Sequence, residues 1–219
     1  MSAKENIAKA ALGVTLGALV MGLFYVTSAK KNSLDQIAVQ LEKEFFADPV
    51  VKAKLSRMPA SEVAAFVSRS AHNGLYWLSP QELDTWNQIR IAMAKSSPEL
   101  CVSYIRGGTS QKDITQAFAQ IGEKSARTWI ALSLTAAKQS IQRAEPLDNQ
   151  NIQKEFQEGL LQVVSVNGPE EQFKLAEILH NYLIKDDEET CWAAIKIHEN
   201  AMKLDSKARH SFLRVLAVL

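Results

Sequence analysis

Residues 110–144 read SQKDITQAFAQIGEKSARTWIALSLTAAKQSIQRA, a long stretch in which large apolar side chains recur every three or four residues. This spacing places such side chains on one side of an α-helix. Gly122 interrupts the stretch, so we expect the helix to bend or divide there. The remaining pattern predicts a broad buried stripe, which consists of Ile114, Phe118, Ile121, Trp129, Leu132 and Leu134.

The same helical spacing recurs on both sides of this stretch, and no segment alternates convincingly with the period of two that marks a strand. Ser79-Pro80-Gln81-Glu82 has the form of an N-cap, a first-position proline and a capping-box glutamate. Ser97-Pro98 resembles it, while Asn73-Gly74 and Asn167-Gly168 are typical of helix ends. We therefore predict an all-α fold, with helices at about residues 5–29, 33–47, 49–57, 60–72, 80–95, 98–106, 110–144, 149–166, 169–185 and 188–217.

The N-terminal segment has the composition of a membrane-spanning helix. Residues 10–26 contain no charged side chain, and 17 helical residues would span roughly 25 Å of a ~30 Å hydrocarbon core. Residues 1–31 are accordingly predicted to form a single transmembrane anchor with basic flanks. Residues 32–219 are predicted to form one all-α soluble domain, and Pro146 makes residues 143–149 the best candidate for a subdomain boundary.

A cleaved signal peptide is the alternative interpretation of this segment, because Lys4 and Lys9 precede the apolar run and Thr27-Ser28-Ala29 could be a cleavage site. The length of the run and the bulky Phe24 and Tyr25 favour the uncleaved anchor. A strict count of flanking basic residues favours a cytoplasmic C-terminal side. A short basic tail before an export-type segment usually stays inside, so we expect the body to be periplasmic or otherwise extracytoplasmic.

Small residues line the predicted membrane helix. Gly13 and Gly17 form a GxxxG pair, and Ala18 with Gly22 forms a second pair of the same spacing. Such pairs let helix backbones approach closely in lipid. They are the candidate residues for helix packing in the membrane and for a homodimer through this helix, although glycine and alanine are common in any membrane helix.

Charge restricts the classes of partner. The chain has 25 basic and 24 acidic residues, and the part after residue 31 has a net charge of −2, which argues against nucleic acid as the main partner. Residues 145–189 contain 11 acidic side chains and only three lysines, whereas residues 190–219 are basic. The two stretches could be adjacent helices with complementary faces, or the first could be an acidic docking surface for a basic partner. Complementary faces are the interpretation that we favour.

The two cysteines, Cys101 and Cys191, suit either one disulfide or two buried thiols. Each lies in an apolar helical pattern, and this context favours buried thiols. Cys191, His198 and His180 could approach one another if their helices pair, but their spacing matches no metal motif. The sequence contains neither a GxSxG nor a phosphate-loop motif, so it predicts no catalytic, cofactor-binding or metal-binding residue.

Two features of the sequence are candidates for a partner surface. Leu75-Tyr76-Trp77-Leu78 lies between a helix break and a cap, so these side chains either tuck beneath the helices or form a contact surface. Tyr76 and Trp77 are the candidates in this run. The other candidates are the consecutive acids Asp186, Asp187, Glu188 and Glu189. At the C-terminus, we expect Leu213, Leu216 and Leu219 to continue an apolar helix face into the core.

These observations predict a membrane-anchored helical accessory or scaffold protein that binds another protein near the bilayer. The inference is mostly negative, because no chemistry is visible in the sequence. An enzyme whose active site has no local signature is an alternative class, and a membrane-tethered chaperone for an exported client is another. A pocket with convergent titratable groups would favour the enzyme, whereas a broad apolar or acidic surface would favour binding.

Overall fold

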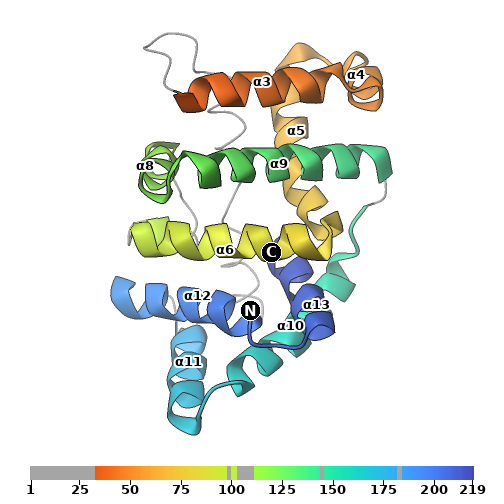
Figure 1. The fold of residues 1–219 in the computed structure, drawn as a ribbon. Helices are drawn as coiled ribbons and strands as arrows, with labels where there is room; N and C mark the ends of the chain where they lie inside the picture. Colours follow the sequence, from red (N-terminus) through yellow and green to blue (C-terminus); the bar gives the residue numbers. More distant parts are fainter. Residues whose placement is uncertain (1–32, 98–99, 103–110, 144–145, 182–183) are drawn as a thin grey trace.

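The computed structural model describes residues 33–97, 100–102, 111–143, 146–181 and 184–219. Every regular element in these ranges is helical, as predicted (Figure 1). The predicted anchor, with Gly13, Gly17 and Gly22, lies outside the described residues. The helices are α3 (Ser33–Ala47), α4 (Pro49–Leu55), α5 (Ala60–Gly74), the 3₁₀ turn η1 (Leu75–Trp77), α6 (Pro80–Ser96), α8 (Gln111–Ile121), α9 (Glu123–Arg143), α10 (Asn149–Ser165), α11 (Pro169–Asn181), α12 (Asp187–Ala201) and α13 (Ser206–Leu216).

A search of the described helices for a membrane span identifies none with the required length and apolar character.

Caps explain where several helices begin. The predicted capping box is present, because Ser79 Oγ accepts a hydrogen bond from Glu82 N (3.4 Å) and Glu82 Oε2 accepts one from Ser79 N (2.7 Å). Ser97 Oγ likewise accepts a hydrogen bond from Leu100 N at 3.1 Å. Asp148 and Asp186 cap α10 and α12 in the same way. Each cap satisfies backbone N–H groups that have no partner inside the helix.

Two long predicted helices are divided. The helix predicted at residues 110–144 was expected to bend or divide at Gly122, and it divides. α8 ends and α9 begins around this residue, whose φ is +86°. The single helix predicted at 188–217 is wrong, because α12 ends at Ala201 and α13 begins at Ser206. Asp205 accepts hydrogen bonds from Lys207 N (2.9 Å) and Ala208 N (3.0 Å), and this cap starts a new helix. The helix predicted at 169–185 also ends early, at Asn181.

The helices stack in layers. Figure 1 shows α3, α9, α6 and α12 in succession, and each contacts the next. α5 crosses α9 closely at Gly74, where a Cβ atom would lie 1.8 Å from the carbonyl oxygen of Ala136. α10, α11 and α13 lie at the end of the stack away from α3 and α4 (Figure 1).

The main hydrophobic core extends from α3 to the C-terminus. Near its centre the rings of Trp86 and Trp129 stack with their centroids 6.3 Å apart. The predicted C-terminal contribution is confirmed, because Leu213 and Leu219 are buried and the half-buried Leu216 packs against the core. A smaller cluster joins α11 to α12 and consists of the buried residues Leu175, Ile178 and Ala193.

The two cysteines form a disulfide, so our preference for buried thiols was wrong. Cys101 and Cys191 are 90 residues apart in sequence, but their Cα atoms are 5.4 Å apart. α6 and α12 pack together, and this pairing brings the residues after α6 to the start of α12. An apolar context is common to buried thiols and buried disulfides, which is why local sequence could not distinguish them.

We predict that Gly74→Ala destabilises the protein by about 3 kcal/mol, because the new methyl group would displace the backbone of α9. This cost outweighs the ~1 kcal/mol that alanine normally gains over glycine within a helix. Gly168→Ala is the matched control, since a Cβ there would meet no atom within 4 Å. Urea unfolding of both variants measures the difference, and equal stability of the two would contradict the packing described here.

Candidate functional site

The acidic stretch occupies one end of the body. Residues 145–189 include α10 and α11 and reach the start of α12, which Figure 1 shows at the end away from α3 and α4. Part of its charge is matched within the fold. Lys196, from the basic C-terminal stretch, contacts Glu171 at 2.6 Å, and Lys185 contacts Glu177 at 2.8 Å and Glu189 at 3.5 Å. The Lys196–Glu171 ion pair joins the basic stretch to the acidic one across α12 and α11, as the complementary-face interpretation expects.

A second group of acidic side chains lines a groove between α10 and α13. The groove has a volume of about 440 Å³. Its rim has three carboxylates and one ammonium group, so its charge is predominantly negative. The lining residues, which we call the α10–α13 groove, are Glu155, Glu158, Gly159 and Gln162 from α10, and Asp205, Lys207, Ala208, Ser211 and Phe212 from α13 and its cap.

The floor of the α10–α13 groove is tightly packed. A Cβ atom on Gly159 would lie 2.4 Å from Cδ2 of Phe212, so the two helices can approach this closely because position 159 has no side chain. The Phe212 ring also stacks on Phe156, with centroids 5.8 Å apart. The charged side chains at the rim are thus carried by two helices whose separation is fixed by buried aromatic contacts.

Tyr76 lies near one side of this groove, because η1 contacts α13 and Glu155 influences the Tyr76 hydroxyl. Leu75 and Leu78 of the same run are buried, whereas the rings of Tyr76 and Trp77 are half-buried and meet edge to face at 4.8 Å. Burial, and secondarily the negative charge of Glu155, raises the pKa of the Tyr76 hydroxyl above its usual value. The Arg214 guanidinium lies 5.7 Å from the Tyr76 ring. Tyr76 therefore belongs to the same electrostatic environment as the groove.

The consecutive acids at the start of α12 are elsewhere. Asp186 is the N-cap of α12 and accepts a hydrogen bond from Glu189 N at 2.8 Å. Asp187 and Glu188 are exposed, and Glu189 pairs with Lys185. These acids lie at the start of α12, which the disulfide joins to the segment after the end of α6. Tyr76 and Trp77 instead precede the start of α6, at the other end of that helix. The structure thus does not bring the two parts of the predicted partner surface together.

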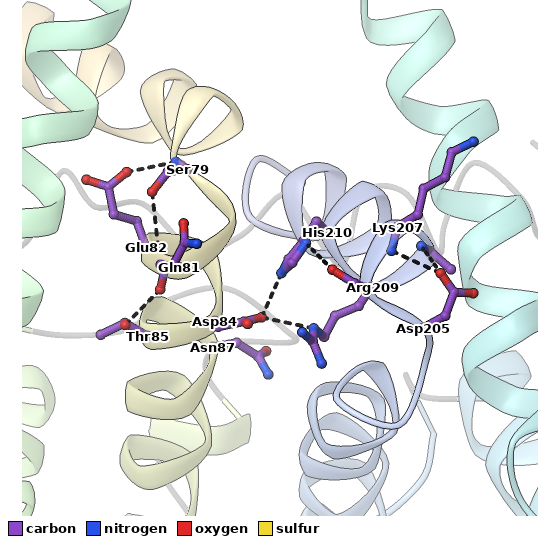
Figure 2. A network of polar contacts seen from close by, with 12 residues as sticks. Ser79, Gln81, Glu82, Asp84, Thr85, Asn87, Asp205, Lys207, Arg209 and His210 are labelled. Atoms are coloured by element: carbon purple, nitrogen blue, oxygen red, sulfur yellow. Dashed lines mark hydrogen bonds and ion pairs between the residues drawn. The ribbon is translucent and has the colours of Figure 1, made fainter.

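A polar seam joins α6 to α13 on the other side of α13 (Figure 2). One carboxylate oxygen of Asp84 contacts Arg209 Nε at 3.1 Å and His210 Nε2 at 3.2 Å, and His210 Nδ1 lies 3.4 Å from Ser206 Oγ. The order serine, histidine, aspartate resembles that of a hydrolase triad. A hydrolase also needs N–H groups near the serine that can stabilise an oxyanion. The N–H groups of Lys207 and Ala208, which follow Ser206, instead donate hydrogen bonds to Asp205. The seam consequently fits a structural role, in which it holds α13 against α6.

His198 is buried between α6 and α12. Asn87 Nδ2 donates to the carbonyl oxygen of His198 at 3.1 Å, which directs Asn87 Oδ1 toward His198 Nδ1 at 2.5 Å. Because this amide oxygen can only accept, Nδ1 carries the proton of a neutral imidazole. Burial, together with the nearby positive charge of Arg90, lowers the pKa of His198 to about 3.

The three side chains that we considered as metal ligands do not come together in the structure. Cys191 is in the disulfide, His198 is bonded to Asn87, and His180 is exposed on α11. Among the residues that the structure describes, no group of three metal-binding side chains converges. His72 is hydrogen-bonded to the backbone of Val218, and burial lowers its pKa.

The groove and the seam were missed by sequence reasoning. Both combine α13 with a helix that is distant in sequence, α10 or α6. The Asp205-Ser206 pair is a helix-start signal that could have revealed α13 as a separate helix. Comparison with protein-family models, with curated proteins and with solved structures finds no match to this chain.

We predict that acidification from pH 7.5 to pH 5 lowers the free energy of unfolding by about 2 kcal/mol through His198 alone. Its pKa is depressed in the folded protein, so the unfolded chain binds the proton first. The stability is complete above the unfolded pKa of ~6.5 and falls by ~1.4 kcal/mol per pH unit below it, until the pH reaches the folded pKa. Urea unfolding followed by tryptophan fluorescence at the two pH values measures this loss.

His198→Gln should reduce the difference between the two pH values even if it destabilises the protein at both. A smaller difference should persist, because the pKa of His72 is also lowered. The exposed His180→Gln is the control and should leave the difference intact. An unchanged difference in His198→Gln would contradict a buried neutral His198.

Proposed function

We propose that this protein is a membrane-anchored accessory or scaffold component without enzymatic activity, and that it binds a partner protein through the α10–α13 groove. The observation that carries the proposal is the acidic rim of this groove, in which Glu155, Glu158 and Asp205 outnumber Lys207. Glu158 is well exposed, and its contact with Lys154 is long, at 4.0 Å. A negative rim of this kind fits a basic segment of a partner.

Exposed apolar side chains at the same end support the proposal. Leu161, Phe173 and Ile184 are 73%, 74% and 84% exposed and lie on α10, on α11 and just after α11. Leu161 is three residues after Glu158, so the two are neighbours on the surface of α10. A combination of acidic and large apolar groups favours a partner segment that is both basic and apolar, such as one face of an amphipathic helix.

The disulfide supports the proposed location of the body. Disulfides persist in oxidising compartments and are rare in the reducing cytosol. The pairing of Cys101 with Cys191 therefore favours an extracytoplasmic body behind an anchor that comprises the uncharged residues 10–26. In this arrangement, the N-terminus remains in the cytoplasm and the acidic end of the body is available to other proteins of the membrane or the exterior.

We predict that Glu155→Gln with Glu158→Gln weakens partner binding at least tenfold, because rim carboxylates contribute through charge complementarity. The measurement is quantitative copurification from detergent-solubilised native membranes, compared with the wild-type protein. Glutamine preserves the shape of glutamate, so the fold should be retained, and circular dichroism checks this.

The matched control is Gln153→Lys with Gln157→Lys. These exposed positions are on the same helix outside the groove, and the substitutions change the net charge by the same amount. If both double variants lose the same proteins, the effect is due to overall charge and the groove is not the binding site. If neither double variant loses a copurifying protein, the groove is not the binding surface.

A further inference from the structure

We propose that the exposed face of α3 and α4 is a second interaction surface, which contacts the anionic headgroups of the bilayer. This inference rests on the membrane anchor of the proposed function. We call the surface the α3–α4 face and define it by Val39 and Lys43 on α3, and by Val50, Lys52, Lys54 and Arg57 on α4 and the turn that follows it.

The chain connects this face directly to the predicted anchor. α3 begins at Ser33, seven residues after Val26, the last residue of the uncharged segment. Seven residues span at most about 25 Å even when fully extended. Figure 1 shows α3 and α4 as the outermost layer of the stack, with α9 on the inner side. The tether thus places the start of α3 close to the membrane surface.

Cationic side chains dominate the α3–α4 face. Lys43, Lys52, Lys54 and Arg57 are all exposed. Three acidic residues lie between positions 39 and 57, the range that contains this face. Asp48 is paired with Lys138 at 2.6 Å, Glu42 is half-buried and Glu44 is exposed, so exposed cations outnumber exposed carboxylates in this range. Each basic residue near an anionic bilayer strengthens attraction about fivefold, provided that it lies within a Debye length of the surface.

Aliphatic side chains lie among these cations. Val39 is 60% exposed and Val50 is 46% exposed. Helical spacing places Val39 beside Lys43, and Val50 beside Lys54, whereas Val51 and Leu55 of α4 are buried in the core. Exposed aliphatic groups between lysines fit the boundary between headgroups and acyl chains, where the apolar groups enter the bilayer and the ammonium groups meet phosphates.

The opposite charges of the two ends reinforce this orientation. The α10–α13 groove is acidic and lies at the end of the stack away from α3 and α4. An anionic bilayer attracts the α3–α4 face and repels the groove. The bilayer contact therefore orients the body with its groove directed away from the membrane, where a basic partner can reach it.

The test uses the full chain in lipid nanodiscs, with an environment-sensitive NBD fluorophore attached to Val50→Cys. The native cysteines are paired and do not compete for the label. Nanodiscs contain either phosphatidylcholine alone or phosphatidylcholine mixed with phosphatidylglycerol. We expect blue-shifted emission and severalfold stronger quenching by nitroxide-labelled lipids in the anionic nanodiscs, with both effects reduced by added salt. A label at Leu161→Cys should remain in water in both lipids.

A fourfold variant tests the role of charge, and it should abolish the difference between the two lipids at position 50. Its substitutions are Lys43→Gln, Lys52→Gln, Lys54→Gln and Arg57→Gln. A control variant removes four exposed cations elsewhere and should preserve the difference. Its substitutions are Lys124→Gln, Arg127→Gln, Lys154→Gln and Lys203→Gln.

The outcomes separate this inference from the proposed anchor. If the protein inserts into nanodiscs but the label at position 50 stays in water, or is buried equally in both lipids, recognition of anionic headgroups is wrong and the anchor stands. If the full chain does not insert, the anchor is wrong and the inference falls with it. A loss of the lipid difference in both fourfold variants would also overturn the role of this face.

Discussion

The close approach of α5 to α9 is the contact on which the arrangement of the other helices depends. Gly74 lies directly against the backbone of Ala136, in the middle of the helix that also contacts α3, α4, α6 and α8. Any side chain at position 74 would separate the two helices and displace η1, which immediately follows Gly74 and leads into α6. The positions of the helices on both sides of α9 therefore depend on the absence of a Cβ atom at position 74.

Local sequence predicted the helices well and their partners poorly, for a physical reason. Caps such as Ser79 and Asp148 act within one turn, so their effects can be read from neighbouring residues. Asp205 carries the same signal, but an apolar pattern that continues across it obscured the break. The disulfide, the α6–α13 seam and the α10–α13 groove each join residues that are far apart in sequence. Periodicity indicates which face of a helix is buried but not which helix covers it, so these features required the structure.

The charge distribution gives the body two different ends. Lysines and aliphatic side chains share the exposed face of α3 and α4, next to the predicted anchor, whereas acidic side chains concentrate on α10 and α11. The disulfide between Cys101 and Cys191 links the segment after α6 to α12. The chain between these two cysteines, which includes α10 and α11, is therefore a covalently closed loop. If the predicted anchor and the proposed binding groove are both correct, this arrangement would direct the groove away from the membrane.

The proposed function requires that the acidic end contact a partner protein in the native membrane. Site-specific photo-crosslinking tests it most directly, with the photoreactive residue at Gln162 in the groove or at Gln88 on the exposed side of α6. We expect a discrete protein adduct from position 162 that position 88 does not form and that an excess of a basic amphipathic peptide suppresses. Identical adducts from both positions, or none from position 162, would contradict it.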